Sequence, residues 1–362
     1  MLSNQLFPEM AMRSLQLVEF GAPLEWREEP TPEPVGAQVL LETLATGVCH
    51  SDLHLWDGYY GDGPTRTYVK DRGVRLPITM GHEIVGRVVA IGPEAEGVAP
   101  GDVRLVYPWI GCGACRHCRD ERSNHCSAMR SIGVLAHGGY ADHVLVPDTR
   151  YLLDVGAMRP EEAASYACAG LTAYTALLKL PLLEADEELV IVGAGGVGLM
   201  AAQIVRAMTE ARVTFVDIDA RKLEAARAFG DFGVLDGSAV DPREELLRRT
   251  EGRGVAAVVD FVGSSQTAAL GQGVLAKNGT LVIVGLFGGE MTVPTHFFPL
   301  RNATIRGSYT GSLRELRELL ALVRERGVRP LPVACHAMDE VPRILDEMRR
   351  GQLVGRAVVV PR

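Results

Sequence analysis

The chain has 362 residues, 47% hydrophobic and 23% charged, which is the balance of a globular protein large enough for two domains. Its net charge of −8 excludes the basic surface that nucleic-acid binding needs, so we expect no nucleic-acid partner. The first residues lack the basic start and apolar run of a signal peptide, so we expect a cytoplasmic protein. Seven cysteines in a reducing compartment point to metal binding rather than disulfides.

The first part of the chain, residues 12–146, contains short runs of alternating hydrophobicity between turns rich in proline and glycine. Residues 38–42 and 84–89 are two such runs. The pattern predicts a small, partly open antiparallel β-barrel. The first eleven residues fit no element of this kind, and we expect them to form a loose arm.

Between residues 160 and 301, continuous apolar runs alternate with amphipathic helical patterns. This alternation indicates an α/β fold with a doubly wound parallel sheet covered on both faces. The predicted strands are 189–193, 213–217, 255–260 and 281–285, and the helices between them include 220–229 and 242–250. Beyond residue 302 we expect helices near 313–326 and 341–350, and then a strand at 356–360 that returns to the first domain.

One apolar stretch, residues 189–205, has nearly the composition of a membrane span. It is slightly short for a bilayer and contains four glycines, so we expect no membrane partner. The same stretch fits a strand, a Gly-x-Gly-x-x-Gly turn and the start of a helix. Such turns place a cofactor pyrophosphate at a helix N-terminus, so we expect Gly193, Gly195, Gly196, Val197 and Gly198 to bind a dinucleotide.

The strand after this turn is predicted to end at Asp217, nineteen residues past Gly198. A carboxylate at this place accepts hydrogen bonds from the ribose hydroxyls of NAD and repels the 2′-phosphate of NADP. NAD is therefore the expected cofactor, although Arg221 and Lys222 could weaken the preference. Alternatively, Asp217 is an ordinary turn residue at the end of a strand.

Four cysteines lie close together in a glycine-rich segment near residues 108–130. Thiolates at this spacing can surround one tetrahedral zinc and leave no open position, which indicates a structural zinc site. The four residues are Cys112, Cys115, Cys118 and Cys126. A DNA-reading zinc finger is disfavoured because the set contains no paired histidines and the chain is acidic.

Three dispersed residues complete the set of candidate ligands: Cys49 in GVCHSD, His82 in GHE and Cys168 in YACAGLTAY. Each alone is more often a core residue. Together they form the two-cysteine, one-histidine set of a catalytic zinc with an open fourth position. The seventh cysteine, Cys335, belongs to no motif and is expected to be a buried free thiol.

These motifs follow one another in a familiar order. GVCHSDLH, GHEIVG, the four-cysteine segment, CAGLTAY, GAGGVG and GQLVGR together resemble the zinc-containing alcohol dehydrogenases of the medium-chain dehydrogenase/reductase family, especially the bacterial, archaeal and yeast tetramers. The resemblance implies a GroES-like catalytic domain at 1–158 and 305–362 and a Rossmann NAD-binding domain at 159–304. It also implies two zinc ions per subunit, a homotetramer, and oxidation of primary or secondary alcohols to aldehydes or ketones.

The resemblance also implies a role for each matched residue. Cys49, His82 and Cys168 would bind the catalytic zinc, on which the alcohol would ionise. The other implied roles are Ser51 and His54 as the proton relay, Asp52 as the group that orients His82, Glu83 as a carboxylate behind the zinc, His50 and Arg356 as contacts of the cofactor phosphates, and Trp56 and Trp109 as pocket walls.

One segment departs from the yeast-type pattern. Residues 57–79 are longer than in those enzymes, and we expect them to form a flap near the substrate cleft. Three other readings share part of the sequence pattern: a zinc-free quinone or enoyl reductase, a polyol dehydrogenase and a structural protein without activity. The first should lack the cysteines, the second usually has glutamate in place of Cys168, and the third has no need of Ser51 and His54.

Overall fold

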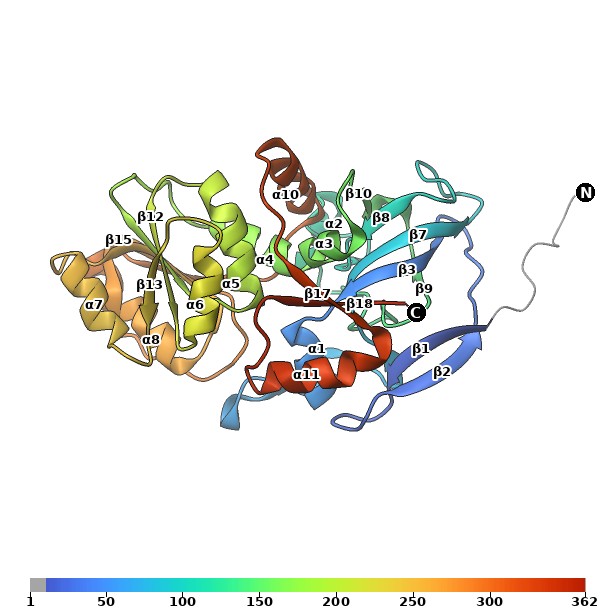
Figure 1. The fold of residues 1–362 in the computed structure, drawn as a ribbon, viewed down its shortest axis with the longest axis horizontal. Helices are drawn as coiled ribbons and strands as arrows, with labels where there is room; N and C mark the ends of the chain where they lie inside the picture. The colour runs from blue at the N-terminus through green and yellow to red at the C-terminus, as the bar shows by residue number, and fades with distance from the viewer. Residues whose placement is uncertain (1–10, 362) are drawn as a thin grey trace, which may run out of the picture.

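The computed structural model describes residues 11–361 and shows two lobes, each built around its own sheet (Figure 1). The arm expected for the first eleven residues therefore lies almost wholly outside the described residues. In the part of the chain that is described, no helix combines the length and the apolar character needed to cross a membrane. The apolar stretch at 189–205 is divided into a strand, a turn and a helix.

The first lobe is the predicted antiparallel barrel. In the described residues, its larger sheet has the order β10-β8-β7-β3-β18-β17, with β9 also paired to β3, and a smaller sheet has the order β2-β1-β6. A short hairpin, β4-β5, stands apart from both sheets. The strands are β1 (Ala11–Leu17), β2 (Glu25–Pro30), β3 (Val39–Gly47), β4 (Tyr59–Tyr60), β5 (Thr67–Tyr68), β6 (Ile78–Thr79), β7 (Glu83–Ile91), β8 (Val103–Val106), β9 (His143–Val146), β10 (Leu152–Asp154), β17 (Val333–Ala337) and β18 (Arg356–Val360).

The second lobe is the predicted doubly wound sheet. Within residues 11–361, its strands are all parallel and have the order β13-β12-β11-β14-β15-β16. The order reverses between β11 and β14, and the glycine turn follows β11 at this point. The strands are β11 (Glu188–Val192), β12 (Arg212–Asp217), β13 (Gly233–Asp236), β14 (Val255–Asp260), β15 (Leu275–Ile283) and β16 (Thr304–Gly307).

Helices cover the parallel sheet and join the two lobes (Figure 1). Helix α4 packs against both α5 and α10, so it links the barrel to the nucleotide lobe. The helices are α1 (His50–Asp57), α2 (Arg116–Arg119), α3 (Pro160–Ala164), α4 (Ala169–Leu177), α5 (Gly196–Ile204), α6 (Ala220–Arg227), α7 (Pro242–Arg249), α8 (Ser265–Val274), α9 (Phe297–Arg301), α10 (Leu313–Glu325) and α11 (Val341–Arg349).

The end of the chain returns to the barrel, as the sequence predicted. Strand β18 pairs antiparallel with β3 through Val358 and Gly47, and β17 joins the sheet parallel to β18 (Figure 1). The sequence did not predict β17, because most of its side chains are only partly buried and show no clear alternation. Our expectation for Cys335 was wrong: the residue lies on this outermost strand and is exposed.

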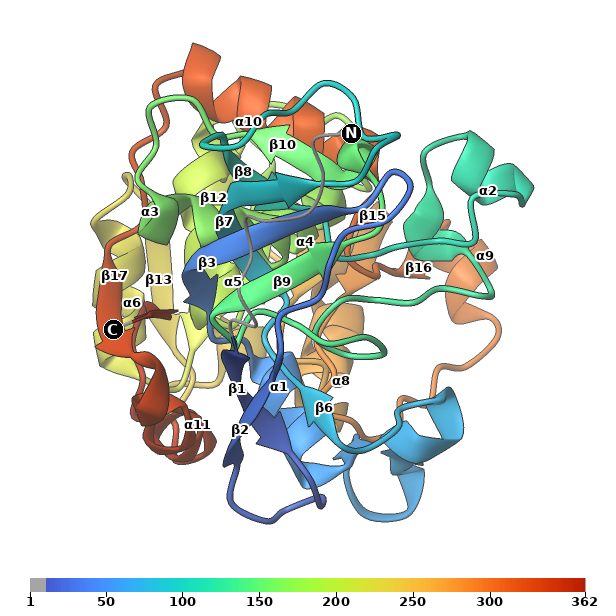
Figure 2. The ribbon, with the colours of Figure 1, turned by 90° about the vertical axis from the view of Figure 1, so that its right-hand side faces the viewer.

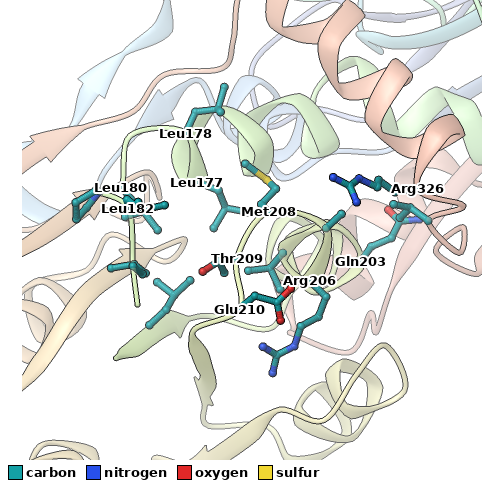
Figure 3. Close-up of a pocket in the computed structure, with 16 residues that line it drawn as sticks. Leu177, Leu178, Leu180, Leu182, Gln203, Arg206, Met208, Thr209, Glu210 and Arg326 are labelled. Carbon is teal, nitrogen blue, oxygen red and sulfur yellow. The ribbon is translucent and has the colours of Figure 1, made fainter. Parts of the chain in front are cut away.

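One cavity lies away from the candidate site. It has a volume of about 760 Å³ and is lined by Leu178, Leu182, Arg206, Glu210 and their neighbours (Figure 3). It includes Leu189 at the start of β11, so it lies at the amino end of that strand. Ligands of open parallel sheets bind at the opposite, carboxyl ends of the strands, so this cavity is not the dinucleotide site.

Candidate active site

The three dispersed ligand candidates come together in the fold. The ligand atoms of Cys49, His82, Glu83 and Cys168 all lie within 4.8 Å of one another, and all four residues are buried. Cys49 caps α1 directly after β3, His82 directly precedes β7, and Cys168 caps α4. Residues separated by more than 100 positions therefore converge because three elements begin or end at one place.

His82 presents one ring nitrogen to this cluster and the other to a carboxylate. Its Nδ1 lies 3.2 Å from Oδ1 of Asp52, while its buried Nε2 has no hydrogen-bond partner. An unpaired buried nitrogen is costly unless something not present in the structure binds it. A zinc ion fits this place, since a carboxylate on Nδ1 is the usual partner of a metal-binding histidine.

Asp52 is itself fixed by two further hydrogen bonds. Its Oδ2 accepts from the backbone N–H of Cys49 at 2.9 Å and from the hydroxyl of Tyr140 at 3.0 Å. The neighbouring Cys168 has the largest effect on the pKa of Cys49 and, with His82 and Arg356, holds it well below its usual value. Cys49 is therefore disposed to be the thiolate that zinc requires.

Glu83 lies behind the cluster and pairs with Arg356 where both side chains are almost fully buried. Burial raises the pKa of Glu83 to about 7, against the opposing charge of Arg356. Its Oε1 also accepts from the backbone N–H of Ala169 at 3.2 Å. A Cβ on Gly47 would lie 2.0 Å from the carboxylate, so only glycine leaves room for Glu83 here.

The four-cysteine segment forms a separate cluster. The sulfur atoms of Cys112, Cys115, Cys118 and Cys126 lie within 4.8 Å of one another, in a lobe around α2 that projects from the barrel (Figure 2). Backbone N–H groups of Cys112 and Cys115 donate to cluster sulfurs at 3.4 Å. N–H donors stabilise thiolates. They lower the pKa of Cys112 to about 6, and the backbone N–H of Ala114 contributes most to this shift. The donor set fits one tetrahedral zinc.

Close packing requires glycine at one position in the four-cysteine lobe and at two positions in the glycine turn. A Cβ on Gly111 would lie 2.3 Å from the sulfur of Cys118. Gly193 has φ +93°, which favours glycine, and Gly198 approaches so closely that a Cβ would lie 1.9 Å from the carbonyl oxygen of Gly193. The close approach of Gly198 to Gly193 lets α5 begin directly after β11, with its free N–H groups facing the turn.

The acidic residue of the cofactor site lies beside this turn. Oδ2 of Asp217 accepts from the backbone N–H of Ala194 at 2.7 Å, and Oδ1 accepts from that of Asp219 at 3.0 Å. Arg221 is held by Asp219 at 2.7 Å, so its charge is not directed to the ribose position. Burial lowers the pKa of His50, and the charge of Lys222 lowers it further.

Arg356 also reaches the cofactor turn. A Cβ on Gly196 would lie 3.0 Å from its side chain, so a larger residue here would crowd the guanidinium. Of the two predicted phosphate contacts, Arg356 therefore lies next to the N-terminus of α5, while His50 begins α1. Val197 follows in the first turn of that helix and is partly buried.

The predicted relay residues lie on the first turns of α1. Ser51 is partly buried two positions after Cys49, and the ring of His54 lies 5.1 Å from that of His50. The ring of Tyr60 lies 5.2 Å from His54 on its other side. Burial, reinforced by the charge of His50, lowers the pKa of His54 to about 4, so the imidazole is neutral at pH 7.

Aromatic side chains continue the wall of the cleft. The ring of Trp109 lies 5.7 Å from His82, and the ring of Tyr309 lies 5.9 Å from Trp109. Both tryptophans are buried in hydrophobic cores, but Trp56 donates its indole N–H to the carbonyl of Ala22 at 2.6 Å, whereas Trp109 contacts His82. The contacts therefore favour Trp109 over Trp56 as a pocket wall.

The sequence reasoning missed Tyr60 and Tyr309. Gly58 is the sequence feature that could have identified Tyr60, because this glycine ends α1 with φ +85° and turns the chain back over His54. A residue just beyond this glycine, and not one inside the helix, reaches the site. Tyr309 lies beyond the parallel sheet and carries no motif that could have identified it.

Comparisons with known proteins agree with this geometry. Residues 36–156 match the alcohol dehydrogenase GroES-like domain, and residues 196–325 match the zinc-binding dehydrogenase domain. An NAD-dependent alcohol dehydrogenase of Sulfurisphaera tokodaii is 38% identical over 97% of this chain and 100% of its own. A D-arabinose 1-dehydrogenase (NADP(+)) of Saccharolobus solfataricus is 30% identical over 95% and 96% of the two chains.

Solved structures give the same result. The crystal structure of the alcohol dehydrogenase from Aeropyrum pernix covers 96% of this chain and 100% of its own, with a TM-score of 0.87 and 31% identity. The acetophenone reductase of Geotrichum candidum in complex with NAD covers 98% of each chain, with a TM-score of 0.83 and 28% identity. The chain belongs to the zinc-containing alcohol dehydrogenases of the medium-chain dehydrogenase/reductase family.

Proposed function

We propose that the protein oxidises primary or secondary alcohols to aldehydes or ketones, and performs the reverse reaction, with NAD as the hydride carrier. The observation that carries the proposal is the buried, unpaired Nε2 of His82 beside Cys49 and Cys168. This arrangement needs a metal, and it lies at the cleft that faces the glycine turn. Two thiolates and one imidazole leave one position of a tetrahedral zinc open for substrate.

The chemistry divides between the bound groups and the protein. Zinc held by Cys49, His82 and Cys168 would supply a Lewis acid that favours loss of the alcohol proton, and NAD would supply the hydride acceptor. The chain positions both: Asp52 fixes the ring of His82, and the turn at Gly193 to Gly198 fixes the pyrophosphate.

The proton leaves through side chains of α1. Ser51 Oγ accepts the hydroxyl proton of the substrate, and His54 passes it toward solvent. Because the pKa of His54 is lowered to about 4, its ring is neutral at pH 7 and keeps a free nitrogen for the proton. Trp109, Tyr309 and Tyr60 limit the entry of water, so the proton follows this path rather than a bulk one.

The four-cysteine lobe has a structural role in this proposal. Its zinc would hold a segment with few hydrophobic contacts, and the lobe reaches α10 through Glu121, whose backbone carbonyl accepts from the N–H of Leu313 at 3.2 Å. The complete subunit would thus bind two zinc ions with different roles.

We also propose a homotetramer that acts in the cytoplasm. Strand β16 is an edge strand with mostly exposed residues, and large apolar side chains lie near it. Phe287 is 56% exposed and Leu300 is 70% exposed. Exposed apolar side chains beside an unpaired strand edge favour pairing with a second subunit. Light scattering on the purified protein tests the oligomeric state, and a particle mass of 39.1 kDa, that of one chain, would contradict the tetramer.

The test of the activity is a panel of alcohols, polyols and sugars followed by NADH absorbance, together with metal analysis. We expect turnover of simple primary and secondary alcohols with NAD and loss of turnover after the metal is removed. Preferential oxidation of polyols or sugars would contradict the proposed substrate class. Full activity in metal-free protein would refute the zinc mechanism.

A further inference from the structure

The segment that follows α1 lies next to the candidate site, because Tyr60 contacts His54. It contains the β4-β5 hairpin and a 3₁₀ turn at Val69–Arg72. The turn is anchored, because the buried Val69 donates its backbone N–H to the carbonyl of Gly58 at 3.0 Å. The tip of the hairpin meets the nucleotide lobe, since a Cβ on Gly288 would lie 2.4 Å from Cα of Gly61. The segment therefore connects the α1 region of the barrel to the nucleotide lobe.

This anchoring places one cationic side chain at the cleft. The guanidinium carbon of Arg72 lies 5.6 Å from the centre of the Tyr60 ring, and Tyr60 in turn contacts His54. Burial raises the pKa of both Tyr60 and Tyr309, and the charge of Arg72 opposes the rise in each case. Arg72 thus contacts the Tyr60 ring, and its charge also acts on Tyr309.

Arg72 differs from the other nearby arginine of this segment. Arg66 lies over the ring of Tyr59 and 3.9 Å from the carboxylate of Asp62. No carboxylate in residues 11–361 lies within ion-pair distance of Arg72, and its guanidinium is exposed. A guanidinium fixed by an aromatic ring, without an acidic partner, is prepared to bind a carboxylate with paired hydrogen bonds.

We infer that Arg72 is a specificity-determining residue that selects alcohols carrying a carboxylate at the end remote from the reacting hydroxyl. The inference rests on the proposed alcohol dehydrogenase activity and names the class of substrate for that site. The hydroxyl end would lie beside Ser51 and the zinc ligands, the connecting carbons would lie between Trp109, Tyr309 and Tyr60, and the carboxylate would reach Arg72. The preferred substrates would then be hydroxy acids, oxidised to oxo acids.

The test compares hydroxy acids of graded chain length with their neutral methyl esters, using NADH absorbance and separate values of kcat and KM. At the best length we expect wild-type protein to favour the acid by roughly tenfold, which is the size of a charge-assisted hydrogen bond. The acid should have a lower KM than the ester and a similar kcat, because Arg72 would stabilise the bound acid equally before and during hydride transfer. High salt should reduce it.

Arg72→Leu keeps the apolar stem and removes the charge. It should abolish the preference for the acid while changing kcat/KM for the ester by no more than about twofold. Arg66→Leu is the matched control, since it removes the same charge from the same segment, and it should retain the preference. The inference would be overturned if Arg72→Leu kept the wild-type ratio of kcat/KM for acid over ester, or if wild-type protein preferred the acid at no chain length. Turnover of the esters would still support the dehydrogenase activity. Absence of turnover with every alcohol would instead refute the proposed function.

Discussion

Arg356 pairs with Glu83 at a place where the two side chains are 4% and 0% exposed. The pair joins the metal cluster to the cofactor turn, because Glu83 follows His82 in sequence and Arg356 packs against Gly196. Burial alone would lower the pKa of Arg356, but the charge of Glu83 raises it, so the guanidinium remains charged. Each charge is stable in the interior only because the other is present.

Removal of one partner should therefore be costly. Arg356→Met leaves the carboxylate of Glu83 buried without a counter-charge, and we expect a loss of about 3–5 kcal/mol in the free energy of unfolding. Denaturant unfolding measures this. The control is Arg87→Met, which breaks an exposed pair with Glu42 and should cost no more than about 1 kcal/mol. Equal effects of the two substitutions would contradict the structural role of the buried pair.

The two metal clusters should respond differently to the loss of one ligand. Cys115→Ala leaves three sulfurs in a lobe with little apolar packing, so we expect little soluble folded protein. Cys168→Ala removes a ligand from a cluster enclosed by the core, so the fold should remain while the catalytic metal and activity are lost. Metal analysis should find two zinc ions per wild-type subunit and one in Cys168→Ala. A stable, active Cys115→Ala protein would contradict this division of roles.

Asp217 should determine the choice between NAD and NADP. Asp217→Ser removes the ribose acceptor and the charge that repels a 2′-phosphate, so the ratio of kcat/KM for NAD over NADP should fall by about tenfold or more. Arg221 alone should help little, because Asp219 holds it. Adding Asp219→Ser should release Arg221 and shift the ratio further toward NADP. A wild-type preference for NADP would refute the role of Asp217.

The sequence predicted most of the fold because its elements carry strong local signals. The glycine turn needs Gly193 and Gly198 for reasons of backbone geometry, and the buried strands of the parallel sheet are continuous apolar runs. Strand β17 was missed because its partly exposed residues have neither signal. The domain boundaries at 158 and 304 remain predictions.

The candidate site was predictable to the extent that chemistry restricts residue type. Cysteine and histidine at Cys49, His82 and Cys168 are identifiable as ligands before their positions are known, and the fold brings them together. Pocket walls carry no such restriction, because any large side chain can serve. Tyr60 and Tyr309 therefore emerged only from the tertiary contacts, and Trp56 proved to lie in a hydrophobic core.

The proton relay gives the sharpest prediction, because its two members should fail in different ways. Ser51→Ala removes the link next to the substrate, where Trp109 and the buried ligands leave little space for water, so turnover should collapse while zinc stays bound. His54→Gln removes the outer link, which water or buffer replaces in part. It should be slowed by about 10-fold to 100-fold, the lower range of general-base effects.

The pH profile and buffer dependence separate a relay from a structural effect. With a pKa of about 4, His54 stays unprotonated and able to accept a proton throughout the neutral range, and it loses this ability only as the pH falls toward 4. Wild-type turnover should therefore be independent of buffer concentration near pH 7, whereas His54→Gln should recover as a small buffer base is added. Ser51→Ala should show no such rescue, because a buffer molecule cannot enter beside the zinc ligands. Near wild-type turnover in Ser51→Ala, or a His54→Gln protein that is not rescued by buffer, would refute the relay while leaving the metal ligands in place.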